Sequence, residues 1–252
     1  MTEPQQHTGS YYAATRNQTS EYPQLQGDQS ADVCVVGAGF TGVSTALHLV
    51  ERGYKVTLVE ANRVGWGASG RNGGQMIGGL SGESAIAKSL GADAESVLWD
   101  LRWAWHKIIR DRVATYNIDC DLKSGYLDLA IKPRHIKDLH AELEMLDRHQ
   151  FAHEYRMLSR EETQDLTGTD AYIGAMLNMG NGHLHPLNLC AGEAAAAVSL
   201  GATIYEQSAV LNIERGTRAR VVAEQGSVSA DFVVLAGNPY HFIEPKLRGP
   251  ML

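Results

Sequence analysis

The stretch DVCVVGAGFTGVSTALHLVERGYKVTLVE, from Asp32 to Glu60, decides the fold of this chain. It opens with an apolar run from Val33 to Val36, which predicts a short strand buried on both faces of a parallel sheet. Apolar residues then recur at helical spacing from Val43 to Val50, and Gly53 stands where a left-handed residue would end a helix. A second strand is expected from Lys55 to Glu60. The stretch therefore predicts a strand-helix-strand unit of an α/β fold.

Three glycines stand between the first strand and the helix in the spacing G-x-G-x-x-G: Gly37, Gly39 and Gly42. Glycine at these positions lets the chain bend sharply, lets its backbone touch a pyrophosphate and lets the helix pack closely on the sheet. The amino end of the helix carries unpaired N–H groups and about half a positive charge, which suits an anion. Glu60 ends the second strand, where its carboxylate can accept hydrogen bonds from an adenosine ribose. We therefore predict a dinucleotide site rather than a ligand-free turn.

The composition indicates a globular protein and argues against several partners. The 252 residues are 44% hydrophobic and 20% charged, enough for one large or two small domains. A net charge of -7 and a pI near 5.8 argue against nucleic acid or an anionic membrane surface. Because we find neither a signal-peptide pattern nor an apolar run approaching about eighteen residues, we expect a cytoplasmic protein. The cysteines, Cys34, Cys120 and Cys190, form no C-x-x-C pair, so we expect no disulfide framework and no zinc site.

A second informative stretch, RVGWGASGRNGGQMIGG from Arg63 to Gly79, is dense in glycine. Its glycines alternate with side chains that can hydrogen-bond a ligand: Ser69, Arg71, Asn72 and Gln75. One interpretation is a flexible surface loop. The stretch leaves the carboxyl end of the second strand, however, beside the crevice where an open parallel sheet binds its ligand. We therefore expect it to run close along a flat polar ring system, with its N–H groups pointing at the ring.

Both stretches resemble flavin-dependent amine and amino-acid oxidases of the D-amino acid oxidase and sarcosine oxidase type. The motifs that carry the resemblance are GAGFTG with Glu60, GWGASGRNGGQ, SYYAAT at 10–15, GHLHPLNL at 182–189 and VVLAGNPY at 233–240. Within that group the chain resembles the bacterial γ-glutamylputrescine oxidases. The resemblance covers nearly the whole chain and implies FAD as cofactor, with a small-molecule amine and O2 as reaction partners.

The resemblance also implies roles along the cofactor. Glu60 and Ala61 would lie at the ribose and the glycine turn at the pyrophosphate, while Ala209 and Val210 would contact the adenine. The glycine-dense loop would line the pyrophosphate and ribityl region and then, from Gly73 on, the isoalloxazine. The expected cofactor-binding residues are Gly37, Ala38, Gly39, Phe40, Thr41, Gly42, Glu60, Ala61, Gly67, Ala68, Ser69, Arg71, Asn72, Gly73, Gly74, Gln75, Ala209, Val210, Ala236, Gly237 and Asn238. No metal ligand is implied, and we name no catalytic residue.

The rest of the chain predicts a second lobe. We expect an N-terminal arm over 1–30, a discontinuous Rossmann-like FAD-binding domain over 31–92 and 187–252, and an incomplete α+β substrate-binding lobe over 93–186. Because relatives are longer, we expect the chain to be C-terminally truncated. The patterns predict helices over 94–116, 133–149, 159–166 and 187–200, and strands over 125–131, 172–177, 202–206 and 232–235, with a ribbon of 221–222 and 228–230.

Two local features admit a second interpretation. His183 and His185 could grip a metal from one face of a strand, although no third ligand is evident nearby. Trp99, Trp103 and Trp105 could form a stacking platform, although aromatic residues at helical spacing usually pack in a core. The apolar side expected for their helix is Val97, Trp103, Ile108, Ile109 and Val113.

The activity that the resemblance implies is oxidation of an amine to an imine by hydride transfer to flavin, with O2 as final acceptor. The carboxylate of γ-glutamylputrescine would need a basic partner, for which Arg102, Lys107 and Arg110 are candidates beside residues outside this chain. An NAD-dependent dehydrogenase and a non-catalytic nucleotide-binding fragment remain alternatives. The sequence carries no prediction of oligomeric state.

Overall fold

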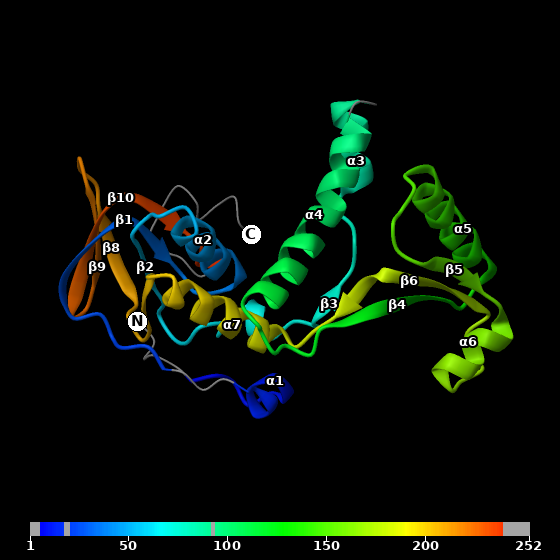
Figure 1. Ribbon diagram of the computed structural model, residues 1–252, viewed down its shortest axis with the longest axis horizontal. Coiled ribbons are helices and arrows are strands. Elements are labelled where there is room, and N and C mark those ends of the chain that lie inside the picture. The colour runs from blue at the N-terminus through cyan, green and yellow to red at the C-terminus, as the bar shows by residue number, and fades with distance from the viewer. Residues whose placement is uncertain (1–5, 18–20, 92–93, 239–252) are drawn as a thin grey trace. The chain divides into compact units, whose positions relative to one another are not determined.

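The computed structural model describes residues 6–17, 21–91 and 94–238 (Figure 1). They form an α/β fold of two compact units. Unit 1 comprises the described residues up to Gly73, Arg112–Cys120, and those from His185 on; unit 2 comprises Gly74–Asp111 and Asp121–Leu184. The boundaries of the two units differ from those of the expected domains, since 74–91 lies in unit 2 and Arg112–Cys120 lies in unit 1. None of the described helices is long and apolar enough to cross a membrane.

Unit 1 contains a six-stranded mixed sheet in the order β7-β2-β1-β10-β9-β8. Its strands are β1 (Gly27–Val36), β2 (Val56–Val59), β7 (Thr203–Tyr205), β8 (Val210–Glu214), β9 (Ala219–Ala223) and β10 (Gly226–Leu235). The four strands β7, β2, β1 and β10 run parallel, and β9 and β8 continue the sheet antiparallel. β1 begins at Gly27, inside the segment expected as the arm, because Gly27–Ala31 pairs with Gly226–Ala230.

The two faces of β1 bury different side chains. Val33 and Val35 pack in a core with α2 (Phe40–Val50) and α7 (Pro186–Ser199), through residues such as Leu47. Cys34 and Val36 face a second core on the other side. Burial on both faces explains the unbroken apolar run of the sequence, and the predicted strand and helix are confirmed. The left-handed Gly53, with φ of +83°, follows one turn after the end of α2.

Unit 2 is built on an antiparallel sheet in which β6 (Gly174–His183) pairs with β3 (Gln75–Met76), β4 (Lys123–Ala130) and β5 (Tyr155–Leu158). Its helices are α3 (Glu83–Leu90), α5 (Pro133–Arg148), α6 (Arg160–Thr167) and α4 (Ala94–Thr115), whose last residues belong to unit 1. The described arm adds α1 (Tyr11–Thr15), and a 3-10 turn, η1, covers Ala68–Gly70. The capping box that predicted α6 is confirmed: the Glu162 N–H donates to Ser159 Oγ at 3.2 Å, and the Ser159 N–H donates to Glu162 Oε2 at 2.8 Å.

The expected apolar side of α4 is wrong in part. Val97 and Ile108 are 57% and 39% exposed, whereas the buried stripe includes Arg102 and His106. Arg102 can be buried because it forms ion pairs with Glu83 and Glu142, at 3.0 and 2.6 Å. The tryptophans lie in contacts with neighbouring rings, as core packing predicts: Trp99 stacks on His149, and the Trp103 and Phe151 ring centroids are 4.3 Å apart.

β10 also departs from the prediction. The ribbon strand 228–230 and the strand 232–235 form one continuous strand, in which Phe232 is 69% exposed. β9 pairs with β10 only as far as Ala230, so among the described strands the last residues of β10 pair with β1 alone.

Candidate functional site

The parallel strands of unit 1 end at one level, which places their connecting loops together. Val36 of β1 is opposite Val59 of β2 and Leu235 of β10, and Val59 is opposite Tyr205 of β7. The carboxyl ends of parallel strands form the ligand-binding edge of an open α/β sheet. Most of the predicted cofactor-binding residues follow these four strands.

The glycine turn after β1 is too close-packed for side chains. A Cβ on Gly37 would lie 2.6 Å from the carbonyl oxygen of Ala236, and φ there is +106°. A Cβ on Gly42 would lie 1.8 Å from the carbonyl oxygen of Gly37. The turn is also tied to β2, since the Gly37 N–H donates to the Val59 carbonyl at 2.8 Å. Glycine is therefore required at both positions by backbone contact, as the spacing predicts.

The amino end of α2 can receive an anion. Its N-cap is Gly39, which has no side chain to cap the helix, and the first turn carries no acidic residue. The N–H groups of Thr41 and Gly42 belong to this first turn, where no carbonyl of the helix can reach them. The Phe40 N–H donates to Ser69 Oγ at 2.9 Å, which brings the glycine-dense loop against the helix end. This donor set suits a pyrophosphate.

Glu60 lies at the glycine turn itself. Its Oε2 accepts the Ala38 N–H at 2.7 Å, and its Oε1 accepts the Asn62 N–H at 2.9 Å. Burial raises the pKa of the carboxyl, and these two N–H groups oppose the shift. A carboxylate has about four acceptor sites, so two N–H donors leave capacity for sugar hydroxyls. The arrangement fits the ribose end of a dinucleotide.

Two further predicted segments lie at this edge. The Ser208 N–H donates to the Glu60 carbonyl at 2.8 Å, which sets Ala209 and Val210 beside the acid; Val210 begins β8. The Ala236 N–H donates to the Val36 carbonyl at 2.8 Å, so Ala236 and Gly237 lie against the glycine turn. Asn238, the last described residue, has a left-handed φ of +54°.

The rest of the glycine-dense loop is only partly joined to this cluster. Arg71 is exposed, with its guanidinium 4.7 Å from the Trp66 ring centroid and its Nη1 3.5 Å from Thr8 Oγ1. Asn72 donates to the carbonyls of Ala68 and Ser69, at 3.2 and 2.9 Å. Ala61 and Gly73 are exposed and Gly67 is half-buried, and all three lie in unit 1.

Gly74 and Gln75 belong to unit 2. The Gly74 carbonyl accepts the Leu184 N–H at 2.8 Å, and the Gln75 side chain lies 3.4 Å from the hydroxyl of Tyr126. Their roles at an isoalloxazine stay predictions.

Both ring nitrogens of His185 are engaged within unit 1. His185 is the N-cap of α7, where its Nδ1 accepts the Asn188 N–H at 3.1 Å, and its Nε2 lies 3.1 Å from Thr15 Oγ1. Across the described residues, no three His, Cys, Asp or Glu side chains gather as a metal site would require.

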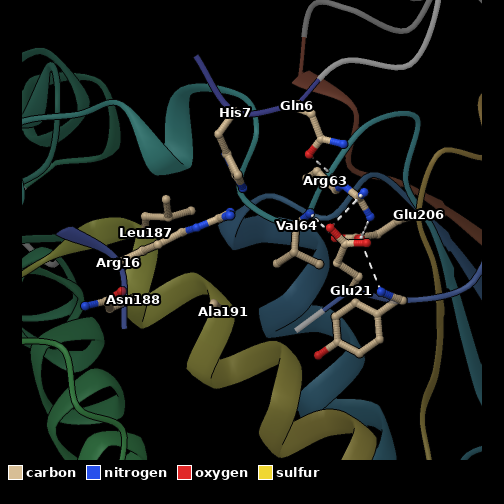
Figure 2. A pocket seen from close by; sticks show the side chains of 11 residues that line it. Gln6, His7, Arg16, Glu21, Arg63, Val64, Leu187, Asn188, Ala191 and Glu206 are labelled. Carbon is tan, nitrogen blue, oxygen red and sulfur yellow. Dashed lines mark hydrogen bonds and ion pairs between the residues drawn. The ribbon is translucent and has the colours of Figure 1, made fainter. Parts of the chain in front are cut away.

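One structural feature beside the site was not predicted from the sequence: a buried ion pair between Arg63 and Glu206, with Nη1 and Oε2 2.7 Å apart. It borders a small pocket in unit 1 (Figure 2). The lining residues are Gln6, His7, Arg16, Glu21, Tyr22, Arg63, Val64, Leu187, Asn188, Ala191 and Glu206. The partners are 143 positions apart in the sequence, and no local pattern couples an arginine to a glutamate at that separation.

Comparison with known proteins decides the family. The model of the DAO family, described as FAD dependent oxidoreductase, matches residues 32–252. The chain belongs to this FAD-dependent oxidoreductase family. The cofactor of the family is FAD, and the uncapped helix end, the close-packed glycines and the buried acid fit that cofactor.

Curated relatives place the chain among the family's oxidoreductases. It is 40% identical over 245 residues to gamma-glutamylputrescine oxidoreductase of Escherichia coli, and 41% identical over 245 residues to the probable oxidoreductase OrdL of Haemophilus influenzae. Each match covers 96% of this chain and 57% of the relative, so the chain spans little more than half the length of these proteins.

Solved structures agree on the fold. L-amino acid deaminase from Proteus vulgaris matches with a TM-score of 0.73 and 25% identity, over 88% of this chain and 50% of that structure. Glycine oxidase from Geobacillus kaustophilus matches with a TM-score of 0.66 and 24% identity, over 84% of this chain and 56% of that structure.

Proposed function

We propose that this chain binds FAD and serves the oxidation of a small amine, γ-glutamylputrescine or a related amine or amino acid, with O2 as electron acceptor. The observation that carries the proposal is the cluster of the Gly37–Gly42 turn, Glu60 and Ser69 at the uncapped end of α2. The substrate rests on the 40% identity to the Escherichia coli relative, which the chain covers to 57%.

In this proposal different residues of unit 1 bind different parts of FAD. Glu60 accepts hydrogen bonds from the adenosine ribose, the first-turn N–H groups of α2 bind the pyrophosphate, and the backbone at Ala209 and Val210 meets the adenine. The glycine-dense loop from Gly67 to Gln75 continues toward the flavin ring. Unit 1 then serves as the FAD-binding domain, and unit 2 as part of the substrate lobe.

When bound, FAD would supply the redox chemistry, as acceptor of the hydride from the amine-bearing carbon and as donor of electrons to O2. The chain's own groups bind FAD and orient it. Charge on the pyrophosphate is stabilised by the α2 amino end, without a lysine or arginine in the Gly37–Gly42 turn.

The candidates for a substrate carboxylate are not equivalent. Arg102 is paired with two carboxylates, and Lys107 Nζ lies 2.5 Å from Asp111. Arg110 donates instead to neutral oxygens, Ser124 Oγ at 3.0 Å and the Gly180 carbonyl at 3.2 Å. Within the described part of the chain Arg110 thus has no carboxylate partner, and of the three it is the one we propose for a substrate carboxylate.

A second candidate function is dinucleotide binding without amine turnover. It is favoured because two of the three candidate cations are already neutralised by carboxylates of unit 2. An NAD-dependent dehydrogenase is a weaker alternative, because it leaves the Gly67–Gln75 loop without a role.

One set of assays separates these functions. The purified chain is titrated with FAD and, separately, with NADH, and is then supplied with γ-glutamylputrescine, putrescine, sarcosine or glycine while peroxide is measured. FAD uptake with peroxide release supports the oxidase, and FAD uptake without peroxide from any amine supports the second candidate. NADH binding without FAD uptake would contradict both.

A further inference from the structure

Glu206 is a buried carboxylate just past the end of β7, and its side chain binds two other segments of unit 1 at once. Its side chain is 2% exposed. Oε1 accepts the Val64 N–H at 2.7 Å, while Oε2 accepts Arg63 Nη1 at 2.7 Å and the Tyr22 N–H at 3.2 Å. The carboxylate therefore joins the N-terminal arm and the loop after β2 to the end of β7.

Arg63 extends the contact further along the arm. Its Nη2 lies 3.2 Å from the carboxylate of Glu21, and its Nε donates to Gln6 Oε1 at 3.2 Å. Figure 2 shows the guanidinium between Glu206 and these arm residues. A planar fork with separate N–H donors is what allows one side chain to hold three partners.

The segment that Arg63 and Glu206 hold also carries the proposed ribose acid. The Asn62 N–H donates to Glu60 Oε1, and the Asn62 carbonyl accepts the Gln207 N–H at 2.9 Å. The Glu60 carbonyl accepts the Ser208 N–H. Residues 60–64 are thus bonded along their length to residues 206–208.

We propose that Arg63 and Glu206 are positioning residues of the FAD site. The pair holds the loop that carries Glu60 and leads to Ser69, and it couples the seating of the N-terminal arm to cofactor binding. The inference rests on the proposed function. It assigns these two side chains no contact with the cofactor.

A second buried pair in unit 1 provides a matched control. Arg112 Nη1 lies 2.7 Å from Glu193 Oε1, and the two side chains are 6% and 3% exposed. This pair joins α4 to α7, and Arg112 also donates to Ser44 Oγ on α2 at 2.9 Å. The two pairs match in chemistry and burial, but the control pair has no bond to residues 60–71 among the described contacts.

The test compares Glu206→Gln with Glu193→Gln in the full chain. Each change removes the buried counter-charge of a buried arginine, and Arg63 then keeps only the exposed Glu21 as an ion-pair partner, so both changes lower the unfolding midpoint. Only Glu206→Gln is expected to weaken FAD binding, by about tenfold or more, the scale on which outer-shell partners of bound metals act. The readout is quenching of flavin fluorescence on titration at a temperature where each variant is folded.

Amide hydrogen exchange at Tyr22 reports the coupling directly. Adding FAD is expected to slow exchange of the Tyr22 N–H in the wild type and in Glu193→Gln, and to leave it unchanged in Glu206→Gln. Arg63→Lys is the milder variant should Glu206→Gln not fold. A lysine keeps the charge but loses the separate donors to Gln6 and Glu21, so we expect severalfold weaker FAD binding and faster Tyr22 exchange.

Three outcomes would overturn the inference alone: equal loss of FAD affinity in the two glutamine variants, wild-type affinity in Glu206→Gln, or wild-type affinity and exchange in Arg63→Lys. A wild-type chain that takes up no FAD would overturn the proposed function, and the inference with it.

Discussion

Replacing Gly42 by alanine tests whether close backbone packing builds the dinucleotide turn. The new Cβ would lie 1.8 Å from the Gly37 carbonyl oxygen, whereas Cβ contacts under 3.0 Å essentially never occur. The start of α2 must therefore move by about 1.2 Å relative to the turn. The obstacle is a backbone atom, so no change of rotamer can relieve it.

The energetic balance of Gly42→Ala has two opposing parts. Alanine in place of glycine inside a helix gains about 1 kcal/mol of propensity. Overpacking of this kind costs about 1–3 kcal/mol, and the backbone clash places Gly42→Ala at the upper end of that range. We expect a net loss of about 1–2 kcal/mol in the free energy of unfolding, together with weaker FAD binding, because the displaced N–H groups belong to Thr41 and Gly42.

Urea denaturation and FAD titration of Gly42→Ala measure the two effects. Gly67→Ala is the control for stability, because a Cβ there meets no atom within 4 Å and φ is negative. If Gly42→Ala unfolds at the wild-type midpoint and binds FAD with wild-type affinity, the close-packing argument is refuted.

Three further predictions test other parts of the structure. Burial of His106 lowers its pKa to about 4, so between about pH 6.5 and 4 the unfolded chain takes up a proton that the folded His106 does not; stability should fall as pH is lowered through this window, and unfolding midpoints that fall as steeply in His106→Phe would contradict this. Ser69→Ala removes the acceptor of the Phe40 N–H, so it should lower the free energy of unfolding by about 1 kcal/mol and weaken FAD binding. A fluorescence titration with FAD that matches the wild type would argue against a role for this contact. Ser159→Ala removes the α6 cap in unit 2 and should cost about 0.5–2 kcal/mol by urea denaturation with no change in FAD affinity, and weaker FAD binding would show that the effect is not local.

Sequence patterns predicted the elements whose cause is local. The run from Val33 to Val36 marks β1 because both of its faces are buried. Ser159 and Glu162 mark the start of α6 because a capping box lies within four residues. The glycine spacing predicts the turn because Gly42 packs against Gly37, five positions earlier, although Gly37 and Gly39 also pack against the distant Ala236 and Ser69.

Features set by distant contacts escaped the sequence. The buried stripe of α4 includes Arg102 because Glu83 and Glu142 neutralise it, and neither partner can be identified from the helix itself. The continuity of β10 past Ala230, where its pairing with β9 ends, depends on the pairing with the distant β1.

The candidate site likewise contains residues that local patterns predict and residues that only distant contacts bring together. The sequence spacing predicts Gly37, Gly42 and Glu60 as site residues, and the structure brings them together. The Arg63–Glu206 pair does not, since its partners meet only after β7 aligns beside β2. Composition alone could not divide the glycine-dense loop between the two units at Gly73.

Titration of the purified chain with FAD, followed by the visible flavin spectrum and by fluorescence quenching, tests the central claim most directly. The account predicts saturable binding of one FAD per chain, weakened about tenfold or more in Glu60→Gln, which loses a charged acceptor for hydrogen bonds at the glycine turn. Absence of saturable uptake by the wild type, or equal affinity in Glu60→Gln, would contradict it.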